Sequence, residues 1–289
     1  MNRSARIIIC VLALVFLFSA SAPNLVWHER SRAAGRGEQT VSKTTEWDPK
    51  TTAVIITDMW DKHWCDVATA RVAEMAPAIN DFLNIARAKG VFIVHAPSET
   101  MDFYRDAPGR KLAQNSPRAA NLPSNINDRC LFASGKFLGE RGVYDLDGGC
   151  SEPCGNKPCL QHNAWKRQIS AIEIKEGDAI SDSGEEIWNL FQQRGIKHVM
   201  LVGVHTNMCI INRPFGLCNW KRQGVDAVLV RDLTDSMYNP QKPPHVDHFT
   251  GTDRVVAYIE KYLAPTVLST DLTGKPPFRF KDDKRTGER

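Results

Sequence analysis

The sequence has little net charge and no long apolar run, and both absences narrow the classes of protein that it can encode. Its 289 residues include 37 Lys and Arg against 33 Asp and Glu, so the net charge of +4 offers no basic footprint for nucleic acid. No stretch reaches the ~20 apolar residues of a membrane-spanning helix. The absence of a Cys-x-x-Cys pair argues against a thiol–disulfide relay, and no internal repeat is present.

The first 22 residues have the pattern of a secretory signal peptide. Arg3 and Arg6 precede an apolar run over residues 7–18, and the small residues Ala20-Ser21-Ala22 follow it. This order predicts cleavage before Pro23 and export to the periplasm or the medium, with no stable membrane insertion afterwards. An uncleaved membrane anchor is the alternative, although the run is short for a span of ~20 residues.

Export permits disulfide bonds, and the cysteine count leaves one thiol over. Beyond residue 22 the cysteines are Cys65, Cys130, Cys150, Cys154, Cys159, Cys209 and Cys218. Six of them can pair in a connectivity that sequence does not fix, and one can stay free for chemistry. Cys150, Cys154 and Cys159, with His162 close behind, also suggest a Cys3His zinc site. Their spacing is wider than such sites prefer, so disulfides are favoured.

Apolar stretches alternate with helical patterns over residues 48–265, which predicts one doubly wound α/β domain: a mostly parallel sheet with helices on both faces. Strands are expected at 53–59, 91–96, 170–174, 198–204 and 226–230. Helices are expected at 69–89, 184–194, between 204 and 224, and 252–263. We expect a flexible leader at 23–47, a Cys-rich insertion at 97–169 and a loosely packed extension at 266–289.

Three residues with catalytic chemistry stand at the expected strand ends. Asp58 closes the first strand, Lys175 follows the third, and Cys209 follows the fourth. Because the carboxyl ends of parallel strands meet at one edge of a sheet, we expect these side chains to meet. A thiol that opens a helix beside an ammonium group should favour the thiolate, and an aspartate can move its proton. Taken alone, an aspartate, a lysine or a cysteine at such a position more often has a structural role. The order of the three residues along the chain is therefore the evidence for a catalytic site.

In that order the sequence resembles the isochorismatase-like cysteine hydrolases, which include nicotinamidases and N-carbamoylsarcosine amidohydrolases. Residues 203–210, GVHTNMCI, are similar to the family's Gly-x-x-Thr-Asp-x-Cys-Val nucleophile turn. Thr57-Asp58-Met59 matches the family's aspartate, and Lys175 stands 34 residues before Cys209, where the family keeps its lysine. The resemblance covers roughly residues 51–232, apart from the insertion.

The resemblance implies a catalytic triad and an oxyanion hole. The triad residues would be Cys209, Asp58 and Lys175. The oxyanion hole would be formed by the amides of Met208 and Cys209, after a cis peptide bond between Val204 and His205.

The sequence also departs from the family pattern. His205 replaces a frequent Ala and Asn207 replaces an Asp; we expect His205 either to bind substrate or to fill space. Trp60 and His63 follow Asp58 closely, so they are further candidates for substrate binding, with a surface turn as the alternative. Nicotinamidases have an Asp-x-His metal pair after the second strand, which this sequence lacks at 94–100. We therefore expect no metal or other cofactor, and a substrate other than nicotinamide.

These features predict an exported hydrolase that cleaves an amide-type C–N bond of a small molecule through a thioester-type intermediate on Cys209. The alternatives are a non-catalytic binding or interaction protein on the same fold, and hydrolysis of a vinyl ether. A small-molecule substrate is the expected partner, and a homo-oligomer is compatible with the sequence. The sequence leaves the substrate open, because pocket walls would come from the insertion.

Overall fold

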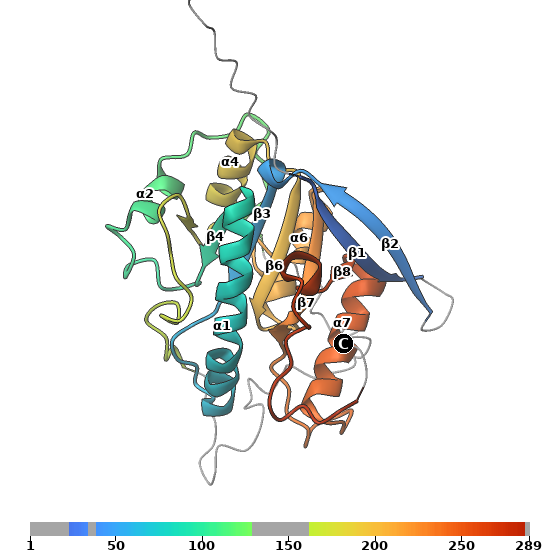
Figure 1. Cartoon of the computed structure of the whole chain (residues 1–289). Coiled ribbons are helices and arrows are strands. Elements are labelled where there is room, and N and C mark those ends of the chain that lie inside the picture. Colours follow the sequence, from blue (N-terminus) through green and yellow to red (C-terminus); the bar gives the residue numbers. More distant parts are fainter. Residues whose placement is uncertain (1–22, 34–38, 129–161, 287–289) are drawn as a thin grey trace, which may run out of the picture.

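The computed structural model describes residues 23–33, 39–128 and 162–286. Within these ranges an eight-stranded sheet runs in the order β2-β1-β8-β7-β6-β3-β4-β5 (Figure 1). The expected signal peptide and most of the Cys-rich insertion lie outside the described residues. No helix in the described ranges has the length and apolar content needed to cross a bilayer.

Most of the elements are short. The strands are β1 (Leu25–Arg32), β2 (Thr40–Trp47), β3 (Thr52–Thr57), β4 (Phe92–Ala96), β5 (Ala179–Ile180), β6 (His198–Val204), β7 (Asp226–Asp235) and β8 (Thr266–Val267). The helices are η1 (Pro49–Thr51), α1 (Asp66–Lys89), α2 (Pro108–Gln114), α4 (Gly184–Arg194), α5 (Cys209–Asn212), α6 (Leu217–Arg222), α7 (His248–Tyr262) and α8 (Thr270–Thr273).

The core lies on both faces of the central strands, which pair in parallel. Successive β3 residues point to opposite faces, so Ala53 and Ile55 join one cluster and Val54 and Ile56 the other. Residues of α4, α6 and most of α7 complete the first cluster, and residues of α1 and α8 belong to the second. The expected doubly wound, mostly parallel sheet with helices on both faces is confirmed.

The expectation of a flexible leader at 23–47 is wrong. This segment forms the antiparallel hairpin β1–β2, in which Leu25 lies opposite Trp47, and β1 continues the sheet by pairing with β8. Trp27 is fully buried and Trp47 is nearly so, with ring centroids 5.9 Å apart. The first five residues of β1 are buried at alternate positions, so a few large apolar side chains within a polar segment suffice for this strand, which lies second from the edge of the sheet.

The expectation of a loosely packed extension at 266–289 is also wrong for its described part. β8 pairs with β7 and β1, and α8 follows directly. Phe280 is buried and stacks on Phe249 of α7 with ring centroids 5.4 Å apart. Isolated aromatic anchors hold this charged segment against the domain.

A third correction concerns the strand expected at 170–174. Residues 170–172 form a turn and a bend, residues 173–174 are irregular, and the edge strand β5 begins only at Ala179, next to β4. The apolar residues there serve as single anchors: Ile172 is buried in the second cluster, and its carbonyl accepts a hydrogen bond from Gln168 (3.2 Å). This shift of the strand changes the place of Lys175.

Candidate active site

Asp58 and the turn that leads to Cys209 meet at the carboxyl edge of the sheet. β3 and β6 pair in parallel with Thr57 opposite Gly203, so both strands end side by side. Gly203 has φ +106°, and a Cβ there would lie 2.2 Å from the Thr57 carbonyl oxygen. Only glycine permits this close approach, which brings the turn after β6 against Asp58. Cys209 then opens α5.

The Asp58 carboxylate is fully buried and held from two sides. Its Oδ1 accepts a hydrogen bond from the Ser98 amide at 2.8 Å, and its Oδ2 accepts one from Arg213 Nε at 3.1 Å. Asp58 itself has φ +47°, a left-handed conformation that non-glycine residues adopt rarely and mostly at constrained sites. The Cys209 thiol adjoins this fixed carboxylate, whose negative charge and hydrogen-bonding capacity both act on the thiol.

The resting nucleophile is a neutral thiol. Burial, followed by the negative charge of Asp58, raises the pKa of Cys209 to about 12, while the Arg213 guanidinium opposes part of that rise. The expectation that the thiolate is favoured in the free protein is therefore wrong, because desolvation outweighs the start of a short helix. The thiol proton must move to a base when the nucleophile acts, and Asp58 is in contact to receive it.

Lys175 does not reach this site, and its expected place in the triad is corrected. Its Nζ donates to Asn84 Oδ1 at 2.8 Å and pairs with Glu173 at 3.0 Å, and its side chain is 48% exposed. Asn84 lies 18 residues after the start of α1 at Asp66, about 27 Å along the helix. The reason is topological: Lys175 precedes β5 instead of following a strand, so it lies at the entry side of the sheet.

Arg213 supplies the cation at the site. It follows Cys209 by four residues, which is one helical turn, and its buried guanidinium contacts Asp58. Its Nη1 also lies 3.5 Å from Glu99 Oε1. We did not predict Arg213; the only signal in the sequence was its spacing from the cysteine.

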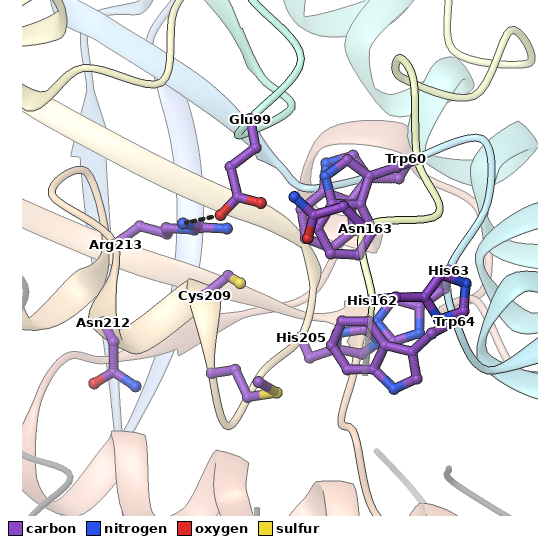
Figure 2. Close-up of a pocket in the computed structure, with 12 residues that line it drawn as sticks. Trp60, His63, Trp64, Glu99, His162, Asn163, His205, Cys209, Asn212 and Arg213 are labelled. Carbon is purple, nitrogen blue, oxygen red and sulfur yellow. Dashed lines mark ion pairs between the residues drawn. The ribbon is translucent and has the colours of Figure 1, made fainter. Parts of the chain in front are cut away.

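A pocket of about 420 Å³ opens onto Cys209, a volume suited to a small molecule. Figure 2 shows the sulfur between the Arg213–Glu99 ion pair on one side and a group of aromatic and histidine rings on the other. The lining residues are Trp60, His63, Trp64, Glu99, His162, Asn163, Trp165, His205, Met208, Cys209, Asn212 and Arg213.

The three residues expected to bind substrate, Trp60, His63 and His205, all line this pocket. Trp60 stacks on Trp165 at 3.9 Å with nearly parallel rings, and its indole N–H donates to the Ser98 carbonyl at 3.1 Å. The His63 and His205 rings meet edge to face at 4.9 Å. Burial is the main cause that lowers the pKa of His63 to about 2 and of His205 to about 4, so both rings are neutral.

The turn before Cys209 is rigidly anchored. The expected cis peptide bond between Val204 and His205 is present. Asn207 is fully buried and bonds both backbone groups of Met237, at 2.8 and 2.9 Å, so its amide serves the structure of the turn. The Met208 amide donates to the His205 carbonyl at 2.9 Å and must leave that bond to face an oxyanion. The Cys209 amide stands at the first position of α5, where helical amides lack a partner within the helix.

A second buried charge cluster borders the pocket. Asp235, at the end of β7, accepts hydrogen bonds from Arg71 Nε and His248 Nε2, each at 2.7 Å. Burial alone would raise its pKa, but the charges of Arg71 and His248 outweigh burial and hold the pKa well below its usual range. These contacts fix the end of β7 against α1 and α7 and back the wall formed by His205.

His95, which lies within the second expected strand, has both ring nitrogens engaged. Nδ1 lies 3.0 Å from Gln168 Oε1 and Nε2 lies 3.0 Å from Asp178 Oδ2, and the ring is fully buried. Asp61 accepts a hydrogen bond from the Lys166 amide at 3.0 Å, which ties the chain that returns from the insertion to the loop after β3. No group of three or more metal-binding side chains occurs in the described residues.

Among the described cysteines, Cys65 and Cys209 are free thiols. The idea that six of the cysteines pair and Cys209 alone stays free does not hold, because Cys65 is unpaired and buried in a small cluster with Ala68 and Met237. Cys130, Cys150, Cys154 and Cys159 lie outside the described residues.

No family model matches the chain. A curated relative, the ureidoacrylate amidohydrolase RutB of Caulobacter segnis, is 24% identical over 174 residues, which cover 56% of this chain and 64% of the relative. Among solved structures, a cysteine hydrolase from Pseudomonas syringae pv. phaseolicola aligns with a TM-score of 0.47 at 16% identity, covering 78% of this chain and 92% of the other. An isochorismatase family protein from Burkholderia thailandensis aligns with a TM-score of 0.44 at 10% identity, covering 78% and 95%.

The fold and site define an α/β protein with a cysteine held against a buried aspartate at the carboxyl edge of its sheet. With the GVHTNMCI turn and the similarity to a curated relative, the chain resembles the isochorismatase-like cysteine hydrolases. The alignment spans just under two thirds of that relative's length.

Proposed function

We propose that this protein is a hydrolase that cleaves an amide-type C–N bond of a small molecule with Cys209 as nucleophile. The observation that carries the proposal is the contact between the Cys209 thiol and the buried Asp58 carboxylate at a pocket of about 420 Å³. The amidohydrolase activity of the curated relative points to the same class of bond.

The reaction divides into acylation and hydrolysis. Asp58 takes the thiol proton as Cys209 Sγ bonds to the substrate's carbonyl carbon, and the negative charge moves to the carbonyl oxygen. Collapse of this intermediate breaks the C–N bond, and the proton on Asp58 passes to the leaving nitrogen. Water then attacks the thioester while Asp58 takes one of its protons. The C–S bond breaks, the acid leaves, and the proton returns to sulfur.

Arg213 is the cation of this triad in place of Lys175. Proton transfer from Cys209 to Asp58 moves a negative charge from oxygen to sulfur beside the guanidinium. Because Arg213 contacts Asp58 at 3.1 Å and its charge acts on the Cys209 thiol, it stabilises the charge before and after the transfer. Arg213 also fixes the carboxylate that it contacts, as a positioning residue.

A panel of small amides, carbamoyl compounds and ureides, assayed for ammonia release, tests the proposal. Cys209→Ala should reduce turnover to background, since Cys209 is the one thiol among the described residues that line the pocket. Arg213→Met should reduce kcat/KM by roughly 100-fold or more, whereas the matched Lys175→Met should change it by less than about twofold. Circular dichroism and the thermal midpoint check that each variant is folded. Retained turnover in Cys209→Ala would refute covalent catalysis, and equal losses in the two Met variants would refute the role of Arg213.

Export is a further part of the proposed function and rests on the pattern of residues 1–22. An exported hydrolase would act on compounds outside the cytoplasm.

A further inference from the structure

The charges around Cys209 are unbalanced toward the negative. Arg213 is the single Lys or Arg among the described residues that line the pocket, and it is shared between two carboxylates, Asp58 and Glu99. The neutral imidazoles of His63 and His205 add no positive charge. The charges of Asp58, Glu99 and Arg213 add up to about one net negative charge. Moving the thiol proton from Cys209 to Asp58 leaves this sum unchanged. The described walls therefore hold no Lys or Arg that is free of carboxylates to receive an anionic group.

Two uncharged hydrogen-bond donors on the lining residues have no partner among the described residues. The Cys65 amide donates to His63 Nδ1 at 3.2 Å, so the proton of the neutral ring is on Nε2. That Nε2 is buried without a hydrogen-bond partner among the described residues, and the indole N–H of Trp165 is in the same condition. Buried donors without partners are rare and are costly unless a ligand supplies an acceptor.

The shape of the pocket adds a third requirement. Trp60 and Trp165 stack with only 5° between their planes, and Trp64 lies 5.7 Å from Trp165 at a tilt. The indole N–H of Trp60 is fixed by the Ser98 carbonyl, so this aromatic wall is held in place before a ligand arrives. A flat ligand fits against it with little ordering cost.

We propose, on the basis of the hydrolase function above, that the substrate is an uncharged, flat amide. A substrate with a carboxylate is selected against, because Glu99 and Asp58 already occupy the guanidinium of Arg213. In this respect the pocket differs from what the name of the curated relative implies, since ureidoacrylate is itself a carboxylate.

The test compares each acid with its uncharged counterpart, such as ureidoacrylate with its methyl ester and succinamate with succinamide. We expect kcat/KM for ammonia release to favour the uncharged member by roughly tenfold or more. Glu99→Gln should reduce that ratio by at least about threefold by removing one negative charge at the pocket. Glu185→Gln is the matched control: it removes the same charge on α4, where Glu185 pairs with exposed Arg118, and should leave the ratio unchanged.

Binding to folded Cys209→Ala separates this inference from the proposed function. If no compound is hydrolysed but the uncharged members still bind more tightly by calorimetry, the hydrolase function fails and the charge selectivity stands. If ammonia is released but the acids are preferred or equal, the selectivity is wrong and the hydrolase function stands. An equal effect of Glu99→Gln and Glu185→Gln, or no binding by either class, also overturns the inference.

Discussion

Replacing Asp58 by Asn should change two properties of Cys209 in opposite directions. The variant removes the base that takes the thiol proton, so hydrolysis should fall by roughly 10²- to 10⁴-fold. It also removes the negative charge that helps to raise the pKa of Cys209 to about 12, while Arg213 keeps its positive charge beside the sulfur. The thiol should therefore become more acidic as the enzyme becomes less active.

The size of the second effect follows from the contact between the groups. At roughly 4 Å and an effective dielectric constant of ~20, two unit charges interact by about 4 kcal/mol, equivalent to roughly 3 pKa units. At pH 7 a thiol with a pKa of about 12 is ionised in roughly one molecule in 10⁵. Asp58→Asn would raise that fraction about 1000-fold. Because a less basic thiolate is a weaker nucleophile, the alkylation rate should rise by only roughly 30-fold.

The assay is the rate of iodoacetamide labelling at pH 7, followed by mass spectrometry of the peptide that contains Cys209. Wild-type protein should label slowly, and Asp58→Asn should label faster. Cys209→Ala measures labelling of the other thiols, including buried Cys65. Fast labelling of wild-type protein at neutral pH would refute the neutral-thiol ground state. Equal labelling of Asp58→Asn and wild type would refute the electrostatic coupling of Asp58 to the thiol.

Two further predictions concern stability and processing. Asp235→Asn should lower the free energy of unfolding at pH 7 by about 3–5 kcal/mol, since it leaves Arg71 and His248 buried without their carboxylate. Because the folded pKa of Asp235 is depressed, its contribution is present above the unfolded pKa near 3.9 and is lost as pH falls below it. Urea titrations at pH 7 and pH 3 should therefore differ less in the variant; an equal acid loss in both proteins would contradict this. N-terminal sequencing of native protein should begin near Pro23, and an intact Met1 on a soluble intracellular form would remove the proposal of export.

The sequence sufficed for the central part of the fold because its strands are buried on both faces. Continuous apolar runs identified β3, β4, β6 and β7 to within a few residues, apart from the polar end of β7. The helix α4 was predicted with its bounds, since a serine caps its start and Gly195 its end. Such signals are local, so they survive in a single sequence.

Elements on the outer side of the sheet, such as β1, escaped prediction because long-range contacts specify them. β1 buries only alternate residues, and its charged positions Arg30 and Arg32 are satisfied by Glu260, more than 200 residues away. No local pattern reveals that partner. The aromatic anchors Trp27 and Phe280 carry the packing in segments whose composition is otherwise polar.

The site shows the same division between local and long-range information. Asp58 and Cys209 were found because each is tied to the end of a buried strand, which the apolar pattern locates. Lys175 was misplaced because its position depended on a strand at 170–174 that does not form. When a lysine is placed only by its spacing, an error in the predicted strand before it also misplaces the lysine.

What the chemistry requires near Asp58 is a positive charge, and the fold can supply it from more than one element. In this chain Arg213 stands one turn after Cys209, so a single turn and short helix position both the nucleophile and its cation. The segment before β5 therefore contributes no residue to the triad, and Lys175 instead donates to Asn84 on α1. Arg213 also differs from a lysine in kind, because its planar guanidinium contacts two carboxylates at once. The contact with Glu99 places that carboxylate in the site. Arg213, which replaces Lys175 as the cation of the triad, therefore also determines the charge of the pocket.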